Sequence, residues 1–197
     1  MKLLLASSSA ARRQMLAATG IPFDPVATTL DEERAKAALA VVALSPRETA
    51  DRLAEMKAGG VENAGDALVL GADQVLERED GAMLGKPDSR EQAADQLRAM
   101  AGRVHHLHSA AVILERGKRV WSGTETATLR MRPLSDAFIE HYLDAEYEAV
   151  RWNVGAYRIE GRGAQLFETV EGSHFAVLGL PLLPLISYLR ARGMLPG

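Results

Sequence analysis

Short apolar runs alternate with amphipathic helical patterns along this chain of 197 residues, and the alternation restricts the fold to the α/β class. The apolar runs predict strands over residues 2–6, 67–71, 105–115 and 120–132. Helical periodicity and capping residues predict helices over residues 9–19, 45–59, 89–100, 135–143 and 182–192. Because the last two strands follow one another directly, we expect a mixed, twisted sheet with flanking helices.

Two segments lack a clear pattern. Residues 29–44 are predicted to be either a mobile segment or an alanine-rich helix, and the glycine-rich residues 155–172 are predicted to be irregular. Neither an internal repeat nor a low-complexity linker divides the chain, so we expect residues 1–197 to form a single domain.

Composition excludes several classes of protein. Hydrophobic residues make up 47% and charged residues 25%, which is typical of a globular domain. The net charge of −3 argues against a general nucleic-acid binder, and the absence of cysteine excludes disulfides and thiolate zinc sites. The apolar run near the start is too short for a signal peptide, and no run approaches the roughly 20 residues of a membrane span. We therefore expect a cytoplasmic protein without membrane or nucleic-acid partners.

The beginnings of the helices differ in how they satisfy their free N–H groups. Residues 45–48 and 89–92 each combine a serine cap with a glutamate or glutamine three residues later. The helix capped by Ser9 instead carries Arg12 and Arg13 in its first turn and no acid. Free N–H groups, serine hydroxyls and a guanidinium together favour a phosphate site. The alternative is a pair of solvated arginines on an ordinary helix.

Two lysines support a site for an anion. Lys57 follows Ala50, Leu53 and Ala54 on the helical stripe that should face inward, although its stem could also extend to the end of the helix. Lys86 lies in a proline-stiffened loop just before a capped helix. A loop lysine alone would be unremarkable.

Carboxylates complete the set of charged groups. Asp73 follows the predicted strand that ends at Gly71, and ligand sites in open α/β sheets lie beyond the carboxyl ends of strands. Gly71 would allow a ligand or a neighbouring backbone to approach, or it would begin a turn. The acidic run 31–33 offers further hard oxygen ligands of the kind that Mg²⁺ or Mn²⁺ prefers, although such runs are usually solvated.

Three histidines lie close together in one predicted strand, at positions 105, 106 and 108. We interpret them as polar strand residues and not as metal ligands, because cysteine is absent and no HExxH spacing accompanies them.

Seven segments resemble, in the same order, those of the Maf family of nucleotide pyrophosphatases: LASSSAARRQML, LAEMKA, GADQV, LGKP, MAGRVHHLHS, GAYRIEG and VLGLPLLPL. The resemblance covers essentially the whole chain. It implies a Maf/ITPase-like α/β fold with two lobes around a nucleotide-binding cleft, and commonly a homodimer.

The resemblance also implies roles for individual residues. Asp73 would be the catalytic acceptor and a carboxylate of the metal site, with Glu32 as a possible second acid for the divalent cation. The triphosphate would be held by cations and a hydroxyl: Ser9, Arg12, Lys57 and Lys86. The chain departs from the family where Ala10 and Ala11 replace a common proline and arginine, which leaves one phosphate or base contact in question.

Base preference can be inferred from three positions. Relatives that prefer thymidine or uridine triphosphate typically have arginine, threonine and glutamine where this chain has Ala11, Gln74 and Glu160. Gln74 and Glu160 instead resemble the subgroup that acts on 7-methylguanosine triphosphate, although the bulky residue of that subgroup at position 11 is missing. Guanine presents two adjacent donors that a carboxylate could accept, which supports this interpretation.

The resulting expectation is a metal-dependent hydrolase that converts a nucleoside triphosphate to a monophosphate and pyrophosphate. The alternatives are a non-enzymatic nucleotide-binding regulator of septum formation, a pyrophosphatase that prefers thymidine or uridine triphosphate, and a nucleotidyltransferase. No GxxxxGK[ST] motif supports the last of these.

Overall fold

The computed structural model describes residues 2–196 and contains a mixed seven-stranded sheet in the order β2-β1-β3-β5-β6-β7, with β4 paired to β3. Strand β1 runs parallel to β2 and β3, whereas β3, β5, β6 and β7 pair antiparallel. The strands are β1 (Leu3–Ala6), β2 (Asp24–Pro25), β3 (Leu68–Arg78), β4 (Met83–Leu84), β5 (Val104–Glu115), β6 (Lys118–Met131) and β7 (Phe167–Glu171). The expected α/β class with a mixed sheet is confirmed.

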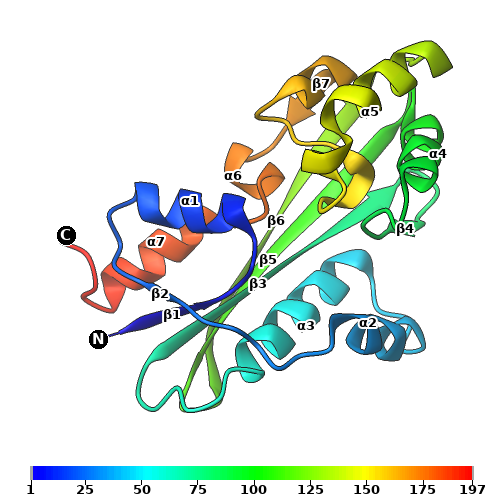
Figure 1. The fold of residues 1–197 in the computed structure, drawn as a ribbon. Helices are drawn as coiled ribbons and strands as arrows, with labels where there is room; N and C mark the ends of the chain where they lie inside the picture. The colour runs from blue at the N-terminus through cyan, green and yellow to red at the C-terminus, as the bar shows by residue number, and fades with distance from the viewer. Residues whose placement is uncertain (1, 197) are drawn as a thin grey trace.

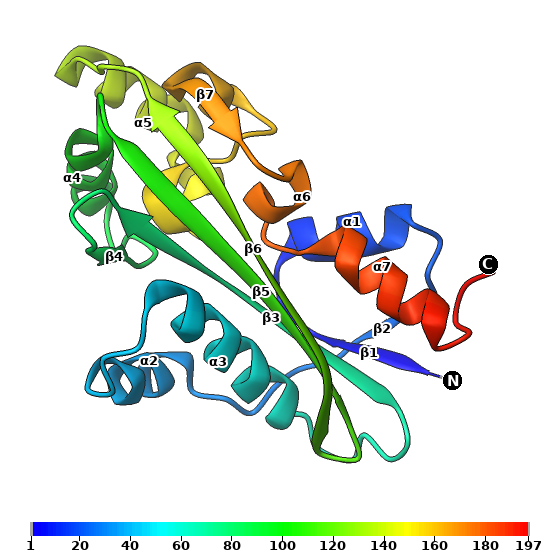
Figure 2. The ribbon, with the colours of Figure 1, turned by 180° about the vertical axis from the view of Figure 1, so that it is seen from behind.

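Helices cover the sheet differently at its two ends (Figures 1 and 2). At one end α1 and α7 lie on one face and α3, flanked by α2, lies on the other. At the other end α4, α5 and the segment before β7 cover the face shared with α1 and α7. The helices are α1 (Ala10–Ala18), α2 (Glu32–Ala40), α3 (Pro46–Gly59), α4 (Arg90–Met100), α5 (Asp136–Val150), α6 (His174–Val177) and α7 (Leu182–Ala191), with 3₁₀ turns η1 (Val154–Ala156) and η2 (Arg162–Leu166).

The apolar side chains of β3 contribute to three separate cores. Leu68 and Leu70 pack with α1 and α7, Val69 packs against α3, and Leu76 packs with α4 and α5. Alternation of side chains along the strand produces this division. Full burial of one such side chain contributes about 1.5–3 kcal/mol, so the three cores hold the helices firmly to the sheet. Gln74 lies on the shared face between two of these cores.

Strand β3 is longer than its sequence pattern predicts, and Asp73 lies inside it and not beyond its end. Pairing of β3 with β5 continues to Arg78, whereas pairing with β1 ends at Gly71. The alternative of a turn at Gly71 is therefore wrong, and the close approach of a neighbouring backbone is confirmed. A Cβ on Gly71 would lie 2.1 Å from the carbonyl oxygen of Ala54, so glycine is needed for the close approach of α3.

Other segments differ from expectation in extent. Residues 29–44 contain α2, so the alternative of a helix is confirmed, and α5 continues to Val150 beyond the expected end at 143. The stretch 155–172 includes η2 and β7, because Thr128 to Met131 of β6 offer pairing partners that local composition does not reveal. No helix in the described part of the chain combines the length and hydropathy that a membrane crossing requires.

Candidate active site

An interruption in strand pairing locates the candidate site. Strand β1 pairs with β3 only as far as Gly71, and β4 begins to pair with β3 at Leu76, so residues 72–75 lie at an open edge between them. The carboxyl end of β1 and the beginning of α1 lie beside this edge (Figure 1). Ligand sites in α/β proteins commonly occupy such positions.

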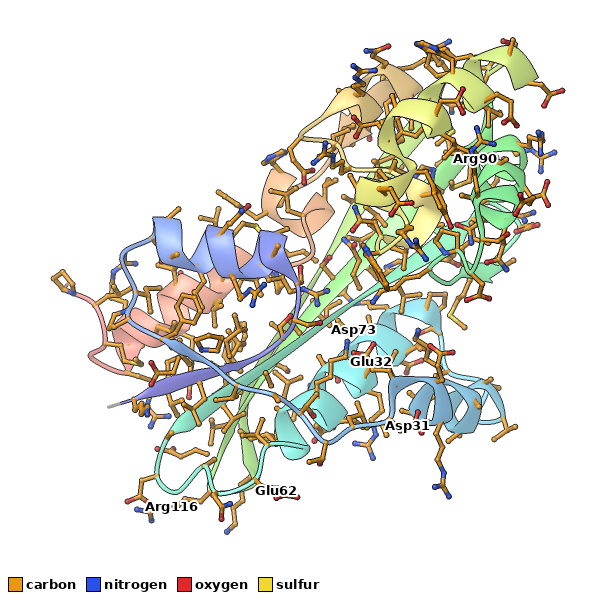
Figure 3. The ribbon with its side chains drawn as sticks, viewed as in Figure 1. Asp31, Glu32, Glu62, Asp73, Arg90 and Arg116 are labelled. Carbon is orange, nitrogen blue, oxygen red and sulfur yellow. The ribbon has the colours of Figure 1, made fainter. Side chains whose placement is uncertain are left out.

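Lys57, Asp73 and Glu32 form a largely buried cluster on the α3 side of this edge. Figure 3 shows Asp73 and Glu32 of this cluster. The ammonium of Lys57 donates a 2.6 Å hydrogen bond to Oδ1 of Asp73 and lies 3.2 Å from Oε1 of Glu32. The side chains of Lys57 and Asp73 are only 9% and 11% exposed. The expectation that Lys57 faces inward is confirmed, and extension of its stem to the end of the helix is excluded.

The acidic run at the start of α2 is divided among three tasks. Asp31 caps the helix by accepting a 3.0 Å hydrogen bond from the backbone N–H of Arg34, and Glu33 pairs with Lys36 at the surface. Glu32 alone turns toward Lys57. Burial opposes the charged form of Glu32, but the nearby ammonium groups outweigh it and lower its pKa; they belong to Lys57, Lys86 and Lys36.

Arg12 is buried, so the alternative of a solvated arginine is wrong for this residue. Its Nε donates a 2.7 Å hydrogen bond to the carbonyl of Gly179, and its Nη1 donates at 3.1 Å to the carbonyl of Ala72. Burial lowers the pKa of this guanidinium, while Asp73 and Glu32 favour its charged form. The cation is therefore held by backbone carbonyls, one of them from the residue directly before Asp73, instead of lying in solvent at the first turn of α1.

Ser9 and Lys86 complete the set of groups near the open edge. Ser9 caps α1 by accepting from the backbone N–H of Arg12 at 3.4 Å, and the first turn contains no acid, as the sequence predicts. Lys86 is exposed in the connection between β4 and α4. Its ammonium lowers the pKa of Glu32, after the larger effects of burial and of Lys57.

The three positions considered for base preference do not converge on one point. Ala11 is half-buried in α1, and Gln74 points to the opposite face of β3 from Asp73. Glu160 is exposed between η1 and η2, where its charge raises the pKa of Tyr142 after the larger effects of burial and of Glu146.

Hard oxygen ligands at this site suit a small divalent cation. Mg²⁺ is commonly bound by one or two carboxylates together with substrate phosphates, and Asp73 and Glu32 supply such a pair. Residues 2–196 contain no cluster of three or more histidine, aspartate or glutamate side chains that could hold a metal by themselves. The histidines of β5 make other contacts: His106 bonds Thr128, and His108 bonds Thr126 and Glu77.

A cavity of about 520 Å³ lies away from Asp73, outside α3. Its wall includes three arginines and three acids: Arg47, Arg52, Arg119, Glu48, Asp51 and Glu55. Because the two kinds of charge are equal in number, the wall has no net positive charge that would attract a triphosphate. The charged cluster at the open edge of β3 is the better candidate.

The sequence pattern did not identify Ser109 and Gly179 as contributors to the site, whereas Ser7 is one of the serine hydroxyls considered for the phosphate site. Ser7 accepts from Nη1 of Arg12 at 3.5 Å, and Gly179 accepts from Nε. Ser109 is fully buried in β5 and donates to the carbonyl of Ala176. A lone serine within the apolar run of β5 was the signal that could have identified it.

Comparison with known proteins agrees with this geometry. A family model described as Maf-like protein matches residues 2–192. The chain belongs to the Maf-like family. A protein of Sphingopyxis alaskensis named nucleoside triphosphate pyrophosphatase is 47% identical over 197 residues, and the alignment covers 100% of each chain.

Other relatives of this family carry the same kind of name. Nucleoside triphosphate pyrophosphatase 1 of a Jannaschia species is 47% identical, with 98% of each chain covered. The nucleoside triphosphate pyrophosphatase of Caulobacter vibrioides is 42% identical, with 97% of this chain and 96% of the relative covered. The crystal structure of a lipoprotein from Neisseria meningitidis aligns at 14% identity over 75% of this chain and 96% of that one, with a TM-score of 0.24, and carries no argument.

Proposed function

We propose that this Maf-like protein hydrolyses a nucleoside triphosphate to a monophosphate and pyrophosphate. The observation that carries the proposal is the buried cluster of Lys57, Asp73 and Glu32 beside the open edge of β3. Full-length relatives named nucleoside triphosphate pyrophosphatase support it.

Charge balance around the open edge favours an anionic ligand that brings a metal. Three cations, Arg12, Lys57 and Lys86, outnumber the two carboxylates of Asp73 and Glu32. One net positive charge attracts a triphosphate but does not neutralise it. A divalent cation bound with the triphosphate would supply the missing positive charge.

The triphosphate would bind along the open edge, held by Ser9, Arg12, Lys57 and Lys86. Ser9 retains a hydroxyl proton to donate, because its cap contact uses the oxygen as an acceptor. Nη2 of Arg12 makes no hydrogen bond to the described residues and remains a donor for an anion.

Asp73 and Glu32 would hold Mg²⁺ or Mn²⁺, which polarises the phosphoryl oxygens and lowers the pKa of bound water. In the reaction the oxygen of water joins the α-phosphorus, and the bridging oxygen to the β-phosphorus leaves with pyrophosphate. Oδ1 of Asp73 accepts from Lys57, and no described residue donates to Oδ2. Oδ2 is therefore the atom that would accept a proton from water or bind the metal. Lys57 would stabilise charge that develops on the phosphates.

Glu160 supports a preference for 7-methylguanosine triphosphate or a related guanosine triphosphate. Its carboxylate is exposed and can accept from N1–H and the 2-amino group of guanine. Methylation at N7 adds positive charge to the base and would strengthen the pairing. Ala11 leaves room beside α1. The resemblance also supports a homodimer in the cytoplasm, which light scattering after gel filtration would test for its oligomeric state.

Product identification with a panel of triphosphates tests the proposal. Purified protein with Mg²⁺ or Mn²⁺ should release pyrophosphate and a nucleoside monophosphate. Release of orthophosphate and a diphosphate would contradict the mechanism. Nucleotide binding without turnover would favour the alternative of a regulator.

A further inference from the structure

The turn after α6 is held by polar side chains from three segments that are distant in sequence. Nε2 of Gln74 in β3 donates to the carbonyls of Ala176 and Val177 at 2.9 and 3.0 Å. Oγ of Ser109 in β5 donates to the carbonyl of Ala176 at 2.6 Å. Nε of Arg12 in α1 donates to the carbonyl of Gly179 at 2.7 Å.

These contacts satisfy carbonyl groups that a short helix cannot satisfy itself. Helix α6 has only 4 residues; the carbonyl of Ala176 also accepts from the backbone N–H of Gly179 at 3.1 Å, whereas the carbonyls of Val177 and Gly179 accept from no backbone N–H of the described residues. Gly179 follows with φ of +99°, and a Cβ at this position would lie 3.2 Å from Nε and Nη2 of Arg12. Glycine therefore permits both the turn and the close approach of the guanidinium.

The turn lies where the two ends of the molecule meet on one face of the sheet. Along β3, Gln74 separates Ala72 of the core under α1 and α7 from Leu76 of the core under α4 and α5. Helix α6 contacts both cores, through Phe175 in one and Val177 in the other. Gln74 and Ser109 thus form a polar junction between the two cores, bonded to each other at 2.9 Å.

The same turn reaches the candidate active site through Arg12. The guanidinium joins Gly179 to the carbonyl of Ala72, the residue directly before Asp73. A displacement of the turn would therefore move Arg12 relative to Asp73. It would leave the contact between Lys57 and Asp73 in place, because α3 packs on the opposite face of the sheet.

We infer that Gln74 and Ser109 are positioning residues that hold Arg12 in place for the triphosphate by fixing the turn formed by residues 176–179. This inference rests on the proposed function. It assigns a role to Ser109 and changes the role of Gln74. The two amide hydrogens of Gln74 are shared among three acceptors, Ser109, Ala176 and Val177, so the amide nitrogen is not available to read a base.

The variants Gln74→Met and Ser109→Ala test the inference, with Gln14→Met and Ser122→Ala as controls at exposed positions. Loss of the hydrogen bonds that either side chain makes to the turn should raise KM for the triphosphate by about fivefold to tenfold and leave kcat within about twofold. The ratio of kcat/KM between guanosine and uridine triphosphates should stay unchanged. The controls should behave like the wild type.

Dissociation constants for a non-hydrolysable triphosphate analogue should rise by the same factor in both variants. This measurement tests the positioning role even if the wild type releases no pyrophosphate. Absence of pyrophosphate release would overturn the proposed function but not the positioning role. A changed base ratio in Gln74→Met would show direct base reading and overturn the inference. Unchanged KM and unchanged affinity would also overturn it, as would a lower kcat at constant KM, which indicates only a smaller folded fraction.

Discussion

Lys57 donates a 2.6 Å hydrogen bond to Asp73, and the same ammonium lies 3.2 Å from Glu32. One buried ammonium thus forms ion pairs with both carboxylates that we propose as metal ligands. A metal that binds this pair must displace the ammonium or share the carboxylates with it. The phosphates of a nucleotide offer Lys57 an alternative partner, so metal and nucleotide should bind together more readily than metal alone.

Lys57→Met should therefore bind Mn²⁺ more tightly in the absence of nucleotide, by about tenfold or more. Removing one partner of a buried ion pair costs about 3–5 kcal/mol, because it leaves charge uncompensated. Mn²⁺ should restore part of that stability. Calorimetric titration and thermal melts with and without Mn²⁺ measure both effects.

Lys118→Met is the matched control for this experiment, because Lys118 is exposed at the beginning of β6 and does not contribute to the pKa of Glu32. Its affinity for Mn²⁺ should equal that of the wild type. Equal affinity in Lys57→Met would mean that the ammonium does not compete with the metal.

Asp73→Asn should reduce turnover by about 10²–10⁴-fold while the protein remains folded. The amide keeps the size of the side chain but removes the charge that metal and proton handling require. Asp66→Asn is the matched control, because Asp66 pairs with Arg116 at the far end of the sheet (Figure 3). Near-normal turnover in Asp73→Asn would place the chemistry elsewhere.

Periodicity was sufficient to predict the α/β class and the inward side of Lys57, because a helical stripe of Ala50, Leu53 and Ala54 can face only the core. It was not sufficient for β3. The small residues Gly71 and Ala72 suggested an end to the strand, but β5 continues to pair with it as far as Arg78.

Arg12 shows which part of the site the sequence could not supply. The local pattern of the helix that carries Arg12 favoured an anion site, with a solvated cation as the alternative, and it did not indicate a buried guanidinium. The acceptors of Arg12 are the carbonyls of Ala72 and Gly179, which lie 60 and 167 positions away in sequence. No local pattern identifies backbone acceptors at such separations.

Arg12→Ala should destabilise the nucleotide-free protein, in contrast to the small gain that the helix dipole alone would predict. Two carbonyls would lose a charged donor, and hydrogen bonds to charged groups contribute about 1.5–3 kcal/mol each. The net loss should be on the order of 2–4 kcal/mol, because a buried cation is removed as well. Urea unfolding measures it. Arg13→Ala, at an exposed position of the same helix, should change stability little.

His105 should make the protein less stable as the pH falls from about 6.5 toward 4. Burial, followed by the charge of His106, lowers the pKa of His105 from 6.5 to about 4. Between these values the unfolded chain binds a proton that the folded protein does not, so the free energy of unfolding decreases on acidification. The slope approaches about 1.4 kcal/mol per pH unit.

His105→Gln removes this titration, so its free energy of unfolding should change less between pH 7 and pH 5 than that of the wild type. Glu32 does not mimic the effect, because its pKa is already lowered and its contribution is lost only below this range. Urea unfolding at several pH values provides the comparison. Parallel pH profiles for the two proteins would contradict a neutral, buried His105.

Glu160→Gln should shift base preference without abolishing turnover. The wild type should favour 7-methylguanosine or guanosine triphosphate over uridine triphosphate, because a carboxylate matches two donors of guanine and poorly matches the two acceptors of uracil. A mismatch of this kind costs about 1–3 kcal/mol, or roughly 5–150-fold in kcat/KM. Glutamine offers one donor and one acceptor, so the preference should narrow.

Glu168→Gln serves as the control for Glu160→Gln, because Glu168 is also exposed and lies in β7. It should leave the ratio of kcat/KM between the bases unchanged. Gln74→Met should leave that ratio unchanged as well. A changed ratio in Glu160→Gln alone would assign base reading to Glu160 and leave Gln74 the role of positioning the phosphate site. If the wild type hydrolyses uridine triphosphate at least as efficiently as the guanosine substrates, Glu160 does not select the base. That result would leave the proposed release of pyrophosphate at the cluster around Asp73 intact.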